Sequence, residues 1–150
     1  MKQVITVSEC QQAVQQIKQS KQSIGFIPTM GALHEGHLSL ITTAKKTCDI
    51  VVVSIFVNPT QFGPSEDFES YPRQLKSDNK MLECHEIDIL FIPTEKIIYP
   101  TSPSTQVTIP KWSKKYCGQS RPQFFDGITS VVCRLLHIIQ PDFAFFGEKD

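Results

Sequence analysis

The sequence has no net charge, no long hydrophobic run and no paired cysteine motif. Its 15 Lys and Arg residues balance 15 Asp and Glu residues, which argues against a nucleic-acid or anionic-membrane partner, because both favour a basic surface. The longest apolar run, Ile50 to Val57, is far shorter than the ~20 residues of a membrane span. The N-terminus lacks the apolar segment of a secretory signal, so we expect a cytoplasmic protein.

The five cysteines are odd in number and widely spaced, and no two of them form a C-x-x-C pair. This spacing argues against a disulfide framework and against a typical zinc site. The sequence therefore predicts reduced, mostly buried thiols and no protein-held metal at Cys10, Cys48, Cys84, Cys117 and Cys133.

Apolar residues are nevertheless plentiful enough for one hydrophobic core. Leu, Ile, Val and Phe supply 44 of the 150 residues, well above the roughly 20% below which chains usually stay disordered. Short apolar segments alternate along the chain with segments of helical periodicity. The pattern predicts strands at 24–28, 50–57, 87–92 and 143–146, and helices at 8–20, through Leu38, Ile41 and Ala44, at 72–85 and at 128–139.

This alternation predicts an α/β fold, a Rossmann-like doubly wound parallel sheet with helices on both faces. Ser8 and Gln11 have the spacing of a capping box at the start of the first helix, and Pro72 falls in the first turn of the third. Residues 106–109 could add a small strand. In such sheets ligands bind at the carboxyl ends of the strands, where three polar clusters occur.

The first cluster is the turn that follows the strand at 24–28 and opens the next helix. Its glycines allow close approach of a ligand, and the N–H groups of a helix start favour phosphate. His34 and His37 could both donate hydrogen bonds to phosphate oxygens during group transfer. The alternative interpretation is a polar helix cap. The candidate residues are Met30, Gly31, Ala32, Leu33, His34, Glu35, Gly36 and His37.

The second and third clusters follow two further strands. The amide of Gln61 offers a donor and an acceptor to a small polar acid, although an ordinary turn with an exposed glutamine is the alternative. After the last strand, a lysine could neutralise phosphates and a carboxylate could accept ribose hydroxyls. The alternative there is a solvated charged turn. This third cluster consists of Gly147, Glu148, Lys149 and Asp150.

Four sequence blocks resemble one known family. Residues 28–40 match its P-T-M-G-A-L-H-x-G-H-L-S-L block, and residues 56–63 match F-V-N-P-x-Q-F-G. Further matches occur at Arg121-Pro122, Phe125, Gly127 and Val131-Val132, and again over residues 141–150. The chain thereby resembles the pantoate–β-alanine ligases, which belong to the H-x-G-H adenylyl-transferring superfamily, over nearly all of its 150 residues.

The resemblance implies ATP-dependent ligation of pantoate and β-alanine through a pantoyl adenylate, with release of AMP and pyrophosphate. It implies that residues 30–37 and 147–150 bind ATP, that His34 and His37 are catalytic, and that Gln61 contacts both pantoate and β-alanine. Mg²⁺ would arrive with ATP, and we expect a homodimer. The alternatives are another H-x-G-H adenylyltransferase and a nucleotide-binding or dimerising domain without turnover.

Two features depart from the family pattern. Family members have a small residue and then His after the Arg-Pro pair, where this chain has Gln123 and Phe124, so we assign no site there. Family members are also nearly twice as long. Because no helix follows the strand at 143–146, we expect residues 1–150 to form an incomplete, truncated N-terminal ATP- and pantoate-binding domain without the C-terminal lid. Such a fragment is expected to be inactive alone.

Overall fold

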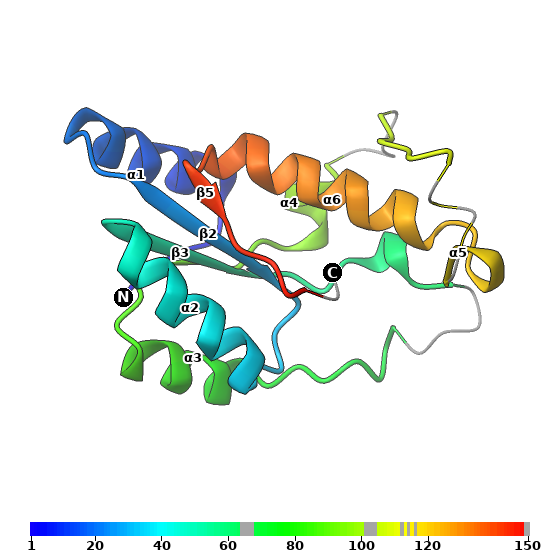
Figure 1. The fold of residues 1–150 in the computed structure, drawn as a ribbon, viewed down its shortest axis with the longest axis horizontal. Helices are drawn as coiled ribbons and strands as arrows, with labels where there is room; N and C mark the ends of the chain where they lie inside the picture. Colours follow the sequence, from blue (N-terminus) through cyan, green and yellow to red (C-terminus); the bar gives the residue numbers. More distant parts are fainter. Residues whose placement is uncertain (64–67, 101–104, 112, 114, 116, 149–150) are drawn as a thin grey trace.

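The computed structural model describes residues 1–63, 68–100, 105–111, 113, 115 and 117–148 (Figure 1). Five parallel strands form one sheet in the order β1-β4-β3-β2-β5, which confirms the predicted α/β fold. The strands are β1 (Lys2–Val4), β2 (Ile24–Thr29), β3 (Ile50–Ile55), β4 (Ile89–Phe91) and β5 (Phe143–Ala144).

Helices cover both faces of the sheet (Figure 1). On one face α1 (Val7–Gln19) and α6 (Phe124–Ile139) pack on Phe26, Val52 and Phe91. On the other face α2 (Glu35–Thr47) and α3 (Leu75–Cys84) pack on the neighbouring strand residues, Ile27, Val53 and Leu90. Because successive strand side chains point to opposite faces, a strand between two helix layers is largely apolar along its whole length.

Three short helices lie in the connecting segments: η1 (Pro59–Gln61), α4 (Glu95–Ile98) and α5 (Cys117–Ser120). η1 follows β3 and packs against the start of α6, and α4 follows β4. Both therefore lie beyond the carboxyl ends of their strands, which is where the predicted site residues are found.

The starts of α1 and α3 differ from the predictions. α1 begins after Thr6, because the Thr6 hydroxyl accepts from the Glu9 N–H at 3.2 Å while the Glu9 carboxylate accepts from the Thr6 N–H at 2.9 Å. The predicted box of Ser8 and Gln11 is therefore wrong, although Thr6 and Glu9 have the same spacing. α3 begins at Leu75 instead of within the turn that contains Pro72.

The strands also differ from the predictions. The described residues at 106–109 form no strand, because the Val107 N–H donates to Ser130 Oγ (2.9 Å) and the Val107 carbonyl accepts from Thr129 Oγ1 (2.6 Å). Side chains of α6 thus take the backbone groups that a strand would pair. The strand β1 was not predicted, since three residues carry too little periodicity to be recognised.

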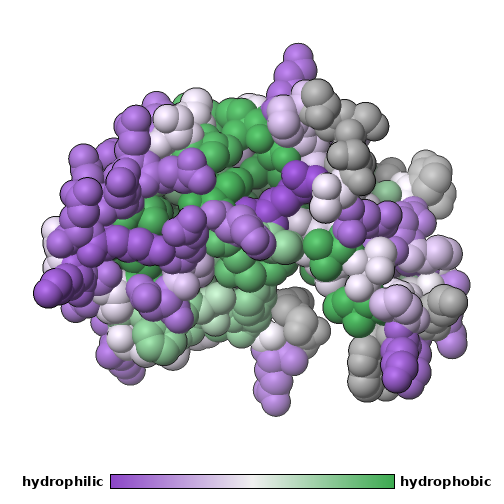
Figure 2. Space-filling model, turned by 90° about the horizontal axis from the view of Figure 1, so that it is seen from above, coloured by the Kyte–Doolittle hydropathy of each residue, from purple (hydrophilic) through white to green (hydrophobic). Residues whose placement is uncertain are grey.

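The last strand was expected to be an inner strand over residues 143–146. In the described sheet β5 is a two-residue strand at the edge, paired with β2 alone. Phe143 and Phe146 are 49% and 42% exposed, so apolar surface is open to solvent beside this strand. Figure 2 looks onto the face that carries α1 and α6 and shows hydrophobic surface bordered by hydrophilic residues.

The cysteines are free thiols, but only two of them are buried. Burial raises the pKa of the Cys10 thiol to about 11 and also raises that of Cys48. Cys84 and Cys117 are exposed and Cys133 is half-buried, so the prediction of mostly buried thiols is wrong. In the described part of the chain, no helix is both long enough and apolar enough to cross a membrane.

Candidate functional site

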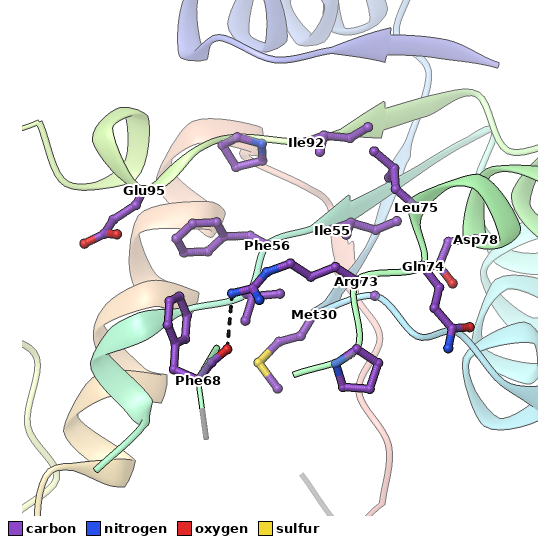
Figure 3. A pocket seen from close by; sticks show the side chains of 14 residues that line it. Met30, Ile55, Phe56, Phe68, Arg73, Gln74, Leu75, Asp78, Ile92 and Glu95 are labelled. Carbon is purple, nitrogen blue, oxygen red and sulfur yellow. Dashed lines mark hydrogen bonds between the residues drawn. The ribbon is translucent and has the colours of Figure 1, made fainter. Parts of the chain in front are cut away.

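A cavity of about 280 Å³ opens at the carboxyl edge of the sheet (Figure 3). Its walls come from the segments after β2, β3 and β4 and from the start of α3. Ile55, Phe56 and Ile92 supply apolar walls, Met30 lies in the opening drawn in Figure 3, and Asp78 lies on α3. The cavity therefore adjoins the first predicted cluster at the place where the parallel fold brings strand ends together.

The turn after β2 is fixed by Thr29, the last residue of that strand. Its hydroxyl donates to the Ser54 carbonyl of β3 at 2.7 Å and accepts from the Gly31 N–H at 3.1 Å. Gly31 has a φ of 81°, and an added Cβ would lie 3.0 Å from a carboxylate oxygen of Asp78. A side chain at position 31 would thus meet both backbone strain and a fixed neighbour.

Asp78 holds the same turn from the opposite side. One carboxylate oxygen accepts from the Ala32 N–H at 3.0 Å and the other accepts from the Leu33 N–H at 2.9 Å. The side chain is buried, with 1% exposed. No sequence pattern predicts this role, because Asp78 is an ordinary polar residue of a predicted helix and its partner Leu33 lies 45 positions away.

Replacing Asp78 with Ala should lower the free energy of unfolding by about 2 kcal/mol, because the buried Leu33 N–H and the part-buried Ala32 N–H both lose their acceptor. Urea unfolding followed by circular dichroism measures this change. Asp78→Asn is the matched control, since it keeps the shape and one carbonyl acceptor and should lose less. Equal stability of Asp78→Ala and the parent chain would contradict the anchoring role.

The two histidines cap the start of α2. His34 Nδ1 accepts from the Gly36 N–H at 3.1 Å, and His37 Nδ1 accepts from the His34 N–H at 3.4 Å. Their ring centroids are 4.2 Å apart. The structure thus contains the polar cap of the alternative interpretation. Because both Nδ1 atoms accept, Nε2 carries the proton of each neutral ring and is the atom able to donate to an anion.

These contacts bear on the prediction that N–H groups of the turn and helix start bind phosphate. Within the structure the donors are already bonded to Thr29, Asp78 or the two imidazoles, so an anion would compete for them or approach the histidine Nε2 atoms. The N–H groups concerned are those of Gly31, Ala32, Leu33, His34 and Gly36.

The structure brings the second cluster to the first. Gln61 Nε2 lies 3.0 Å from the sulfur of Met30, although the two residues are 31 positions apart. Gln61 ends η1, whose N-cap Asn58 is buried with 1% exposed. The glutamine is half-buried, with its amide beside Met30, instead of being an exposed turn residue.

Close approach of α6 holds η1 in this place. Asn58 Nδ2 donates to the Gly127 carbonyl at 3.2 Å. A Cβ at position 127 would collide with the Thr60 carbonyl and would lie 2.8 Å from the backbone nitrogen of Gln61. Gly127 is thus needed for contact between helix and loop, which gives a structural reason for its place in the matched block.

The segment that departs from the family pattern lies at the start of α6. Gln123 is the N-cap of this helix and makes no side-chain capping bond. The guanidinium of Arg121 lies 4.1 Å from the centroid of the Phe124 ring. The aromatic substitution is thus accommodated by a cation–π contact.

The third cluster follows the edge strand β5. Because β5 is parallel to β2, Gly147 and Glu148 continue to the same edge of the sheet as Met30 and Gly31. Lys149 and Asp150 lie outside the described residues. The structure therefore places half of this cluster near the first one.

Arg73 is a cation beside the cavity that the sequence analysis did not assign. Its guanidinium donates to the carbonyls of Glu69 (2.9 Å) and Phe68 (3.2 Å) and lies 5.0 Å from the centroid of the Phe68 ring (Figure 3).

Among the described residues no group of three or more His, Cys, Asp or Glu side chains could hold a metal ion.

Comparison with known proteins relates this geometry to one family. The family model for pantoate-beta-alanine ligase matches residues 2–150. A pantothenate synthetase of Shouchella clausii is 50% identical over the whole chain, which covers 50% of that relative. One of Thermotoga petrophila is 49% identical, with 54% of its length covered. The chain spans about half the length of the curated relatives it matches.

Solved structures have the same fold. A pantothenate synthetase of Thermus thermophilus matches with a TM-score of 0.90 and 40% identity, over 97% of this chain and 51% of that one. A Francisella tularensis pantoate-beta-alanine ligase complexed with beta-gamma ATP and beta-alanine matches with a TM-score of 0.90 and 42% identity, over 96% and 55%. On these matches, the chain belongs to the pantoate-beta-alanine ligase family.

Proposed function

We propose that this chain supplies the ATP- and pantoate-binding part of an enzyme that joins pantoate to β-alanine. ATP would be consumed to AMP and pyrophosphate, and pantothenate would be the product. The observation that carries the proposal is the contact between Gln61 and Met30, which unites two predicted clusters beside the helix start with its two histidines. A family relative in complex with an ATP analogue and β-alanine supports the choice of ligands.

In the first step a pantoate carboxylate oxygen attacks the α-phosphorus of ATP. The bond from that phosphorus to the pyrophosphate oxygen breaks, which leaves pantoyl adenylate and pyrophosphate. Negative charge builds on the phosphate oxygens as this happens, and preorganised donors stabilise it. We assign this role to Nε2 of His34 and His37 at the start of α2, whose dipole also favours an anion.

In the second step the amine of β-alanine attacks the activated carbonyl of pantoate and AMP leaves. Activation is needed because a free carboxylate has no competent leaving group. The step gains mainly from holding the amine and the acyl carbon together. We assign Gln61 to this positioning. Beside Met30, its amide can donate a hydrogen bond to one ligand group and accept a hydrogen bond from another.

We further propose that Met30 to His37 and Gly147 to Asp150 bind ATP, with Mg²⁺ held by the phosphate oxygens. Mg²⁺ commonly binds in proteins through substrate phosphates and a few carboxylates, and that chemistry is the basis for this part of the proposal. A cytoplasmic homodimer completes the proposal, supported by the exposed Phe143 and Phe146 beside β5 as apolar surface for association.

The reaction is tested by joining this chain to the C-terminal half of the Shouchella clausii relative and assaying the purified protein. Pyrophosphate release that requires pantoate, followed by AMP release that requires β-alanine, is the expected result. Pyrophosphate release with phosphopantetheine, but not with pantoate, would indicate a different H-x-G-H adenylyltransferase.

In that joined protein, Gln61→Ala should weaken pantoate binding by roughly 1–3 kcal/mol, because polar ligand groups lose their partner. ATP affinity should hardly change, since η1 follows β3 whereas the predicted nucleotide turn follows β2. Titration calorimetry with each ligand separately measures both affinities. An equal loss for ATP and pantoate would mean that the loop has collapsed, and would remove Gln61 as a specific contact.

A further inference from the structure

We propose that Tyr99 is a positioning residue for substrate recognition, acting through the buried amide of Asn58 on Gln61. This inference rests on the proposed role of Gln61. Tyr99 comes from the segment after β4, whereas Asn58 and Gln61 follow β3. The tyrosine therefore ties a second strand end to the loop that holds the substrate-binding amide.

The Asn58 amide has one orientation in this network. Its Oδ1 accepts from the Thr60 N–H at 3.4 Å, and its Nδ2 donates to the Gly127 carbonyl at 3.2 Å. A backbone N–H can only donate and a backbone carbonyl can only accept, so a flipped amide would face both with the wrong group. Buried polar groups left in that state are costly, which fixes the orientation.

Tyr99 completes the set of donors to this oxygen. Its hydroxyl donates to Asn58 Oδ1 at 2.9 Å, and the Thr60 hydroxyl donates to the same oxygen at 2.9 Å. Both Thr60 contacts are local, because that residue is two positions away. The bond from Tyr99 spans 41 positions, so among these donors it is the one that holds the loop against another part of the fold.

The orientation of Asn58 passes directly to Gln61. Asn58 Nδ2 donates to Gln61 Oε1 at 3.2 Å, which turns Gln61 Nε2 toward the Met30 sulfur at 3.0 Å. Gln61 therefore presents a defined amide: an N–H donor and the second lone pair of its oxygen remain for ligands. A substrate acid with both an acceptor and a donor would be recognised by this arrangement.

Tyr99 is itself held firmly enough to act as a support. Its ring packs 6.3 Å from the Phe56 ring, and the Arg134 guanidinium lies 5.1 Å from its centroid. Burial raises the pKa of the Tyr99 hydroxyl, so the group keeps its proton at neutral pH. A protonated hydroxyl is the form that donates to Asn58.

The first test needs no ligand and uses the side-chain amide signals of the ¹⁵N-labelled 150-residue chain. Tyr99→Phe keeps the ring and removes the hydroxyl. We expect the Gln61 Nε2 signal to shift and its order parameter to fall below about 0.6, the range of flexible groups. Tyr71→Phe, which alters a second half-buried tyrosine packed on Phe62, is the control and should leave the signal unchanged. An unchanged Gln61 amide in Tyr99→Phe overturns the proposal.

The second test is a double-mutant cycle on pantoate affinity in the joined protein. Tyr99→Phe should weaken pantoate binding roughly 3- to 10-fold with Gln61 present and should have no effect in the Gln61→Ala background. An equal loss in both backgrounds would show a merely structural role and overturn the inference. Normal affinity in Gln61→Ala alone would instead refute the proposed role of Gln61, while the amide signals still decide whether Tyr99 positions it.

Discussion

The 150-residue chain by itself is expected to bind ATP weakly and to make no pantothenate at a rate ordinary for an enzyme. Transition-state stabilisation needs donors that converge from several loops in a site that excludes water. In this structure His34 is exposed and His37 is half-buried at an open helix start. Water screens charges at such a site, so each interaction contributes less than it would in an enclosed one.

The relatives give a second reason for this expectation. The chain covers 50% and 54% of two pantothenate synthetases, so about half of each relative lies outside the match. Weak ATP binding is still expected, because the turn at Gly31 and the start of α2 are complete and anchored by Thr29 and Asp78. We therefore expect this chain to bind ATP weakly without synthesising pantothenate.

The measurement is a coupled AMP-release assay with the purified chain, ATP, pantoate, β-alanine and Mg²⁺. Titration with ATP alone gives the binding arm, and the protein joined to the C-terminal half of a relative is the positive control. Steady pantothenate synthesis by the chain at ~1 s⁻¹ or more, an ordinary enzyme rate, would contradict this prediction and show that the chain suffices for turnover.

The sequence predicts the layered fold because its main signals are local and strong. Ile50 to Val57 is an almost continuous apolar run, and the structure accordingly buries Val52 on one face and Val53 on the other. The stripe at 128–139 predicts α6, which in fact begins four residues earlier at Phe124. β1 and β5 are too short for a periodic signal, so their places in the sheet depend on partners far along the chain.

Less of the candidate site than of the fold can be predicted from the sequence. Motifs predict His34, His37 and Gln61 as site residues and leave a helix cap as the alternative for the histidines, but they do not predict the contact between Gln61 and Met30. Supports such as Asp78 and Tyr99 act across 45 or 41 positions. Each is an ordinary helix or loop residue in the sequence, and only tertiary contact gives it a role.

This difference follows from the way the fold forms its site. The residues proposed to contact ligands lie in glycine-containing turns that follow strands, so turn chemistry and motif spacing predict them. Residues that hold those turns lie on elements such as α3 and the segment after β4, and they are selected by shape and hydrogen-bond geometry. The second group must therefore be read from coordinates, and its variants should change affinity or stability more than chemistry.

His37→Ala tests the chemistry itself and should lower pantoyl-adenylate formation at least ~10²-fold in the joined protein, as expected for loss of one transition-state donor. Its bond from the His34 N–H is long, 3.4 Å, so the loss of capping should cost less than about 1 kcal/mol of stability. The measurement is single-turnover pyrophosphate release, alongside urea unfolding. His137→Ala is the matched control, because that exposed histidine lies near the far end of α6 and should leave the rate unchanged. Parental pyrophosphate release in His37→Ala would remove this residue from the mechanism and leave it as a helix cap.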